Sequence, residues 1–223
     1  METTLSIFDD RKNEIDFYFS IMVDINNNEP HIQTIDNNRF FKILKSNFIL
    51  MLYNIVEACV VSGMLEIYEN IKNDACTYHS AIEEIKKLWS NHKINQIYGP
   101  NSIKSTYENK VREIINDITN NNHIILTKSA LDISGNLDAR KIKDLCDKHR
   151  IRHSAKDVNA SLSKVKKKRN DLSHGDVSFS ECARDLTISD LEEIQDEVLI
   201  FLRDILAGMK NYYDNKQYLV ASG

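Results

Sequence analysis

The 223-residue chain has 42% apolar and 28% charged residues, a balance typical of a water-soluble globular protein. Its six glycines and two prolines are too few for a turn-rich all-β chain, so we expect mostly helical structure. The net charge of −4 excludes the overall positive field of a general nucleic-acid binder, and any contact with a polyanion must be local.

The length fits one domain with an insertion better than two small domains. The four cysteines are scattered without a C-x-x-C pair, and no basic-then-apolar leader opens the sequence, so we expect reduced thiols and a cytoplasmic location. The apolar stretch 48–65 is interrupted by Asn54 and Glu57, which would be costly at membrane depth. We interpret this stretch as a buried core helix and expect no membrane association.

Apolar residues at helical spacing predict three helices in the first half of the chain, over 11–25, about 37–72 and about 78–92. The second is apolar on several faces in its middle, which is typical of a central helix. Turn signals then bracket a short amphipathic helix near 103–118, and we interpret about 90–137 as an insertion or irregular segment. Within it, 123–137 fits either a short strand or a loop.

Three helices are predicted in the second half. Asp138 is placed to cap one that stops near His149. The next, over 157–175, contains the basic run KVKKKR and has Gly175 placed to end it in a left-handed conformation. The last, over 189–216, is predicted to begin at Ser189 with Glu192 completing a capping box.

Arg169 is unusual within the basic helix. Leu162, Val165, Arg169 and Leu172 follow one another in steps of three, four and three, so the arginine shares the apolar stripe. A guanidinium on a packed face needs an acid, an anion or a partner chain. His174, five residues on, is rotated by about 140° in a continuing helix, and two such segments facing each other across a two-fold axis could still join both groups at one phosphate.

Other candidate residues have less specific patterns. Lys164, Lys167 and Lys168 are expected to lie in water as a charged face that can hold an RNA backbone. Cys146, His149 and His153 have spacing that invites a zinc site, but a fourth ligand is not evident, so no metal is expected. Tyrosines after residue 211 fit core packing better than base stacking; these are Tyr212, Tyr213 and Tyr218.

The string Arg169-Asn170-Asp171-Leu172-Ser173-His174 resembles the R-x4-H signature of the HEPN superfamily, including its polar residue after the arginine. Four further segments resemble the bacterial MAE-type HEPN-like nucleases, so nearly the whole chain takes part. They are RKNEIDFYF at 11–19, SNFILMLYNIVEA at 46–58, GNLDARKI at 135–142 and the SF of VSFSECARDLT.

The resemblance implies an all-α fold, a HEPN-type antiparallel helical bundle with a small insertion between the third helix and the motif-bearing half. It implies a homodimer with a composite active site that cuts RNA without a metal ion or other cofactor, in a defence or toxin-antitoxin system. Arg169 and His174 would be catalytic and Asn170 supporting. RNA supplies its own nucleophile in the 2′-hydroxyl, so an acid/base and a cation suffice.

Two alternatives remain open from the sequence. One is a catalytically silent HEPN module that binds RNA, a nucleotide or a protein partner, and the other is a purely structural helical dimer. In a sister group, a tyrosine two positions after the histidine is modified by a partner nucleotidyltransferase, but here that position is Asp176. Control of that kind is therefore in doubt, and an antitoxin or defence-system partner remains an expectation.

Overall fold

The computed structural model describes residues 1–28, 36–95, 104–131, 133, 135–156 and 158–221. Within these ranges the chain forms eight α-helices and one short 3-10 helix, and β-type pairing is limited to two isolated bridges. The predicted all-α fold is confirmed. The helices are α1 (Glu2–Asn28), α2 (Asn37–Asn73), α3 (Glu83–Asn95), α4 (Lys104–Thr119), η1 (Lys128–Leu131), α5 (Ala139–His149), α6 (Asn159–His174), α7 (Phe179–Cys182) and α8 (Ile188–Asp214).

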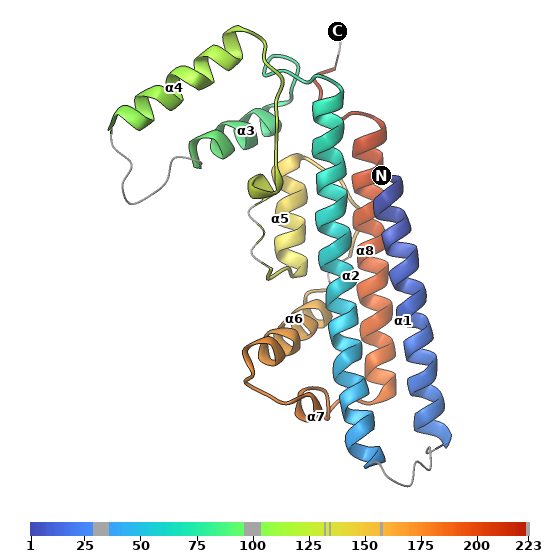
Figure 1. The fold of residues 1–223 in the computed structure, drawn as a ribbon. Helices are drawn as coiled ribbons and strands as arrows, with labels where there is room; N and C mark the ends of the chain where they lie inside the picture. Colours follow the sequence, from blue (N-terminus) through green and yellow to red (C-terminus); the bar gives the residue numbers. More distant parts are fainter. Residues whose placement is uncertain (29–35, 96–103, 132, 134, 157, 222–223) are drawn as a thin grey trace.

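The central element is α2, along which α1 and α8 pack while α6 and α7 cover its first half (Figure 1). Phe48, Ile49 and Leu52 are among many of its side chains with no exposed surface. By length and composition α2 could cross a membrane, but more than half of its most apolar window is buried within the fold. The helix predicted over 37–72 and its role as the core helix are therefore confirmed.

The first helix is longer than predicted, since α1 begins at Glu2 and not at residue 11. Of its first ten residues, Thr4 and Phe8 are buried. Thr4 anchors the turn through polar contacts, because its hydroxyl lies 2.9 Å from both Ser62 Oγ and Glu66 Oε1 on α2. An apolar pattern does not register such an anchor, although Leu5 and Phe8 do continue the apolar spacing of the helix before residue 11.

The helices α3 and α4 project from the bundle as an arm (Figure 1). Lys93 of α3 holds α4 through Glu113 at 2.8 Å and Asp117 at 2.9 Å.

The helix predicted near 103–118 is confirmed by α4. The predicted start of α3 at residue 78 is wrong, because Thr77 and Ser80 form a hydrogen-bonded turn first. In its described residues, the segment 123–137, left open between strand and loop, is a loop that contains η1 and one isolated β-bridge at His123.

The ends of α5, α6 and α8 follow capping rules. Asp138 accepts a hydrogen bond from Lys141 N at 2.9 Å and begins α5, as predicted. Gly175, with φ of 75°, ends α6, as predicted.

The predicted capping box of α8 at Ser189 is wrong: Thr187 and Asp190 form it instead. Leu186 before the cap and Leu191 after it are both buried, which is the arrangement of a hydrophobic staple and favours the earlier start.

The short helix α7 is tied to α2 by two polar side chains in the first third of α2. Ser46 Oγ donates to Phe179 O at 2.6 Å and accepts from Ala183 N at 3.2 Å. Lys45 Nζ donates to the carbonyl oxygens of Arg184 and Leu186, and burial lowers the pKa of this amine. These contacts fix α7 and the turn that leads from it to α8.

The loop after α5 packs closely against Gly208 of α8, and a substitution of this glycine tests that packing. A Cβ at this position would lie well inside van der Waals contact of the Arg152 carbonyl oxygen and 3.1 Å from His153 Cβ. Alanine normally stabilises a helix by about 1 kcal/mol over glycine, whereas overpacking costs about 1–3 kcal/mol. We expect Gly208→Ala to lower the free energy of unfolding measured in urea. The control is the exposed neighbour, as Ala207→Gly should cost only about 1 kcal/mol; a gain in stability for Gly208→Ala would contradict the packing.

Candidate functional site

The motif helix α6 packs its apolar stripe as predicted and leaves its last turns partly open. Leu162 and Val165 have no exposed surface, whereas Arg169 and Leu172 further along the stripe are half-buried. The helix continues to His174, and the chain then turns as Asp176 N donates to Asp171 O at 2.9 Å. Arg169 therefore lies where the packed face of α6 meets solvent.

Arg169 is held by an aromatic ring and an amide. Its guanidinium carbon lies 4.6 Å from the centroid of the Tyr53 ring on α2, a cation–π contact of about 0.5–2 kcal/mol. Its Nη1 donates to Asn170 Oδ1 at 3.0 Å. Among the residues that the structure describes, no carboxylate lies within ion-pair distance of this guanidinium. The half-buried positive charge therefore has free donors and no neutralising partner within the described chain.

Asn170 connects Arg169 to the loop before α5. While its Oδ1 accepts from Arg169, its Nδ2 donates to Asn136 Oδ1 at 2.9 Å. The same loop is fixed by Tyr53, whose hydroxyl donates to Gly135 O at 2.6 Å and accepts from Leu137 N at 3.1 Å. Burial is the largest cause of the raised pKa of Tyr53, so the hydroxyl stays protonated and can donate.

Tyr53 and Asn136 were missed as candidate residues, although both fall within segments that carry the family resemblance. A tyrosine in the middle of an apolar helix was a usable signal, because a buried hydroxyl needs a partner.

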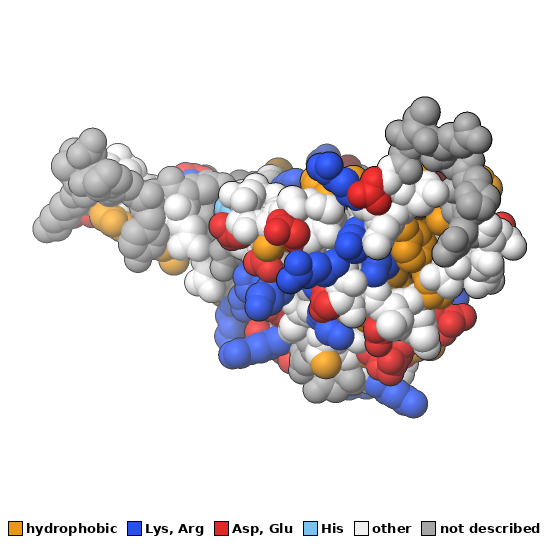
Figure 2. All heavy atoms as spheres, turned by 90° about the horizontal axis from the view of Figure 1, so that it is seen from below, with side chains coloured by type: hydrophobic (Ala, Val, Ile, Leu, Met, Phe, Trp, Pro, Cys, Tyr) orange, Lys and Arg blue, Asp and Glu red, His pale blue; other side chains and the backbone are white. Residues whose placement is uncertain are grey.

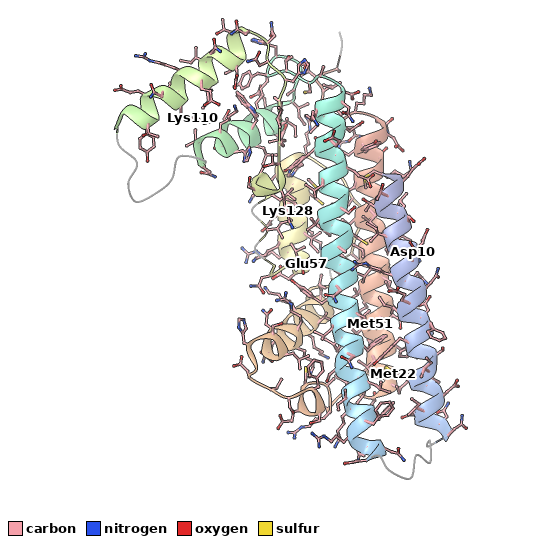
Figure 3. All side chains as sticks on the ribbon, in the orientation of Figure 1. Asp10, Met22, Met51, Glu57, Lys110 and Lys128 are labelled. Atoms are coloured by element: carbon pink, nitrogen blue, oxygen red, sulfur yellow. The ribbon has the colours of Figure 1, made fainter. Side chains whose placement is uncertain are left out.

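Glu57, labelled in Figure 3, lies one turn beyond Tyr53 on α2 and close to Gly135. Its charge raises the pKa of Tyr53, whereas the Arg169 charge lowers it. The site is thus built from α2, α6 and the loop before α5.

His174 is exposed at the last position of α6. It makes no hydrogen bond or ion pair with any residue in the described ranges. At 100° per residue a regular helix turns its side chain about 140° away from Arg169. One chain therefore brings Arg169 and Asn170 together and leaves His174 on another side of the helix.

The predicted RNA-binding lysines are placed differently from one another. Lys164 and Lys167 are exposed, as expected. The expectation that Lys168 lies in water is wrong: its side chain is 15% exposed, pairs with Asp185 at 3.0 Å and donates to the Cys182 carbonyl oxygen. Lys166 also has a partner, Asp138 at 2.7 Å, which links α6 to the cap of α5. Figure 2, a view from the end where α7 lies, shows that Lys and Arg side chains gather there among acidic ones.

Among the residues with zinc-like spacing, His149 has two structural partners, whereas His153 Nδ1 is buried without a hydrogen-bond partner in the described residues. His149 is fully buried, with Nδ1 2.7 Å from Leu145 O and Nε2 2.7 Å from the Tyr68 hydroxyl. Because a carbonyl only accepts, Nδ1 carries the proton and Nε2 accepts from Tyr68. Burial raises the pKa of the Cys146 thiol to about 12. Within the described residues no three His, Cys, Asp or Glu side chains are grouped as metal ligands.

The fold and the site together define a class. The structure has an all-α bundle in which a half-buried arginine ends the packed face of one helix, five residues before a histidine, and this agrees with the HEPN-type domain that the sequence resembles. The family model described as "HEPN_MAE_28990:/-like HEPN" matches residues 1–218, and the chain belongs to this MAE-type HEPN-like family. No curated protein and no solved structure matches the chain.

The hydroxyl of Tyr53 can be tested separately from its ring. Tyr53→Phe keeps the surface under Arg169 but leaves the buried Leu137 N–H without its acceptor. A buried backbone donor without a partner costs about 1–3 kcal/mol, so the free energy of unfolding in urea should fall by that amount. Tyr18→Phe is the control, since the Tyr18 hydroxyl lies on a half-buried residue and its removal leaves no buried backbone N–H without an acceptor. Equal losses in the two variants would mean that Tyr53 does not fix the loop.

His149 makes stability depend on pH. Burial lowers its pKa from 6.5 to about 4, so the unfolded chain takes up this proton before the folded one. Its contribution is complete above pH 6.5 and is lost as the pH falls toward 4, at about 1.4 kcal/mol per pH unit. We expect the free energy of unfolding of His149→Gln, measured in urea over this range, to fall less steeply than that of the unsubstituted chain. Parallel curves would contradict this origin.

Proposed function

We propose that this chain is a metal-independent endoribonuclease. It attacks RNA through the substrate's own 2′-hydroxyl, forming the bond from O2′ to phosphorus and breaking the bond to O5′. His174 takes the proton from the attacking hydroxyl, O5′ takes up a proton as it leaves, and Arg169 binds the oxygens of the scissile phosphate. The products are a 2′,3′-cyclic phosphate and a 5′-hydroxyl end.

The observation that carries this proposal is the half-buried position of Arg169, whose charge has no acidic partner in the described residues. A half-buried guanidinium held by an aromatic ring and a neutral amide keeps its full charge and retains free donors. Arginine is suited to bidentate contacts with phosphate, and such contacts are stronger where water is partly excluded. Asn170 and Asn136 support it by fixing the plane of the guanidinium. Membership of the HEPN family agrees with a nuclease or an RNA-binding module.

We further propose that the complete site needs two copies of the chain. The support is that α6 is helical through His174, so the histidine of one chain is turned away from its own arginine. In an isologous dimer around α6, the arginine of one chain can meet the histidine of the other. Phe179, 41% exposed and five residues beyond His174, would provide apolar surface there. We also propose that the nuclease acts in a cytoplasmic defence or toxin-antitoxin system, in which a partner restrains it; the support is the resemblance to the HEPN family.

The second candidate is a module that binds RNA, a nucleotide or a protein partner without cutting RNA. It is favoured by one observation: His174 has no orienting hydrogen bond among the residues that the structure describes. A catalytic imidazole usually has one ring nitrogen oriented by a partner. In a dimer, the second chain would have to supply that partner.

Cleavage of RNA in excess EDTA tests the first proposal. We expect purified full-length protein to cut RNA in EDTA and to leave cyclic phosphate ends. Arg169→Ala and His174→Ala should each lower the rate at least about 100-fold, the usual scale for an electrostatic contact or a general acid–base. The controls are Arg203→Ala and His79→Ala, which remove exposed residues outside α6. RNA bound but uncut would favour the second candidate, and undiminished cutting by His174→Ala would remove His174 from the mechanism.

Mixing the two inactive variants tests the two-chain site in the same assay. Half of the dimers in an equal mixture pair Arg169→Ala with His174→Ala, and one of their two sites then keeps both residues. About a quarter of the original activity should return, as follows from a two-fold dimer. No recovery, although the mixed dimers form, would contradict a site that takes one residue from each chain.

A further inference from the structure

Positive charge is concentrated in α5, α6 and the segment between them. Residues 139–169 contain twelve Lys and Arg against three Asp and Glu, a net charge of +9 with histidines neutral, whereas the rest of the chain carries −13. Lys166 and Lys168 are engaged by Asp138 and Asp185. Lys141 and Lys148 of α5 are exposed, and neither forms an ion pair within the described residues. These two ammonium groups are available to an anionic ligand.

A cavity of about 250 Å³ opens between these lysines. Lys141, Asp144, Leu145 and Lys148 line it from one face of α5, since their spacing of three, four and seven residues places them along a single stripe. The two lysines are about 10 Å apart along the helix axis and flank the opening. The remaining walls are apolar apart from Asn136 and include Leu131 and Leu137. The cavity thus has a mixed lining, which combines leucine and isoleucine side chains with two cations and two hydrogen-bonding side chains.

The cavity is connected to Arg169 through direct contacts. Asn136 lines the cavity and accepts from Asn170 Nδ2 at 2.9 Å, and Asn170 in turn accepts from Arg169. Leu137 lines it as well, and its backbone N–H donates at 3.1 Å to the Tyr53 hydroxyl. A chain of phosphates that runs over the guanidinium therefore passes next to the cavity.

We propose that this cavity is a subsite for one unstacked nucleotide of a single-stranded RNA, adjacent to the phosphate that Arg169 holds. The base enters the cavity beside its leucine side chains, Asn136 and Asp144 meet its hydrogen-bonding edge, and Lys141 and Lys148 contact the phosphates beside it. A base stacked in a duplex cannot turn into a cavity, whereas unstacked bases of single strands are recognised in this way. The inference rests on the proposed function, because it takes Arg169 as the phosphate-binding group.

Binding of a short single-stranded 2′-O-methyl oligoribonucleotide, followed by fluorescence anisotropy, tests the subsite. This probe lacks the 2′-hydroxyl nucleophile and cannot be cut. We expect Lys141→Ala/Lys148→Ala to weaken binding about tenfold and to reduce the slope of log affinity against log salt by about 1.4, for two lost phosphate contacts on a single strand. The control, Lys72→Ala/Lys210→Ala, removes two exposed lysines near the far ends of α2 and α8 and should change affinity less than twofold. Equal effects of the two pairs would overturn the proposal.

A second measurement tests the entry of the base. A series of the same oligonucleotide is made in which each member lacks the base at a different position. We expect binding to weaken about tenfold in the member that lacks the base that fills the cavity, and to change little in the others. Ile133→Trp places a larger side chain in the cavity wall and should abolish this position dependence. Abasic positions that all behave alike in the unsubstituted protein, or stronger binding of a duplex of the same sequence, would overturn the proposal.

The subsite and the proposed nuclease can fail separately. Weakened binding by Lys141→Ala/Lys148→Ala with no cleavage of any RNA would support the subsite and leave a binding module. Normal binding and normal cleavage by this double variant would overturn the subsite and leave the nuclease. Failure of the unsubstituted protein to bind single-stranded RNA would overturn both.

Discussion

The burial of α2 is the constraint on which the rest of the molecule depends. A 37-residue helix that is apolar on several sides can bury most of its surface only if other helices pack around it. α1 and α8 pack along its length and α6 and α7 cover its first half (Figure 1), while a strip that includes the exposed Asn54 and Glu69 stays open to solvent. Polar side chains of α2 appear where a neighbour must be held at a defined position: Ser46 and Lys45 hold α7, and Tyr53 holds the loop before α5. The candidate site is therefore a consequence of how the core helix is covered.

Most of the fold could be predicted because its signals are local. The helical spacing of α2, the Asp138 cap and the left-handed Gly175 are each encoded within a few residues. The errors arose where two local signals compete or where an anchor is polar. Thr187 and Ser189 both precede a suitable acid by three residues, and only the packing of Leu186 and Leu191 decides between them. Thr4 anchors the start of α1 through a hydroxyl, which leaves no trace in an apolar pattern.

The candidate site was predictable in part. The step pattern of α6 placed Arg169 on the packed face, and its half-buried position agrees with that. Its surroundings could not be predicted, because Tyr53, which it contacts, and Asn136, which bonds its neighbour Asn170, lie 116 and 33 residues away along the chain and come near only through the tertiary fold. The basic run KVKKKR also suggested a continuous RNA-binding surface that the fold does not present. Lys166 and Lys168 are used to join α6 to its neighbours, and the exposed lysines on α5 attract less attention in the sequence because Asp144 and Asp147 lie between them.

The contact between Arg169 and Tyr53 also determines which motions can reach the site. Proteins open locally in cooperative units, and the units with the most buried contacts open last. Because the Tyr53 ring belongs to the fully buried middle of α2, the surface under the guanidinium can be lost only when the central helix itself unfolds. Fraying of the α3–α4 arm leaves that surface untouched. The arginine therefore has a support as long-lived as the folded domain, while the histidine at the exposed end of α6 has the freedom of a helix terminus.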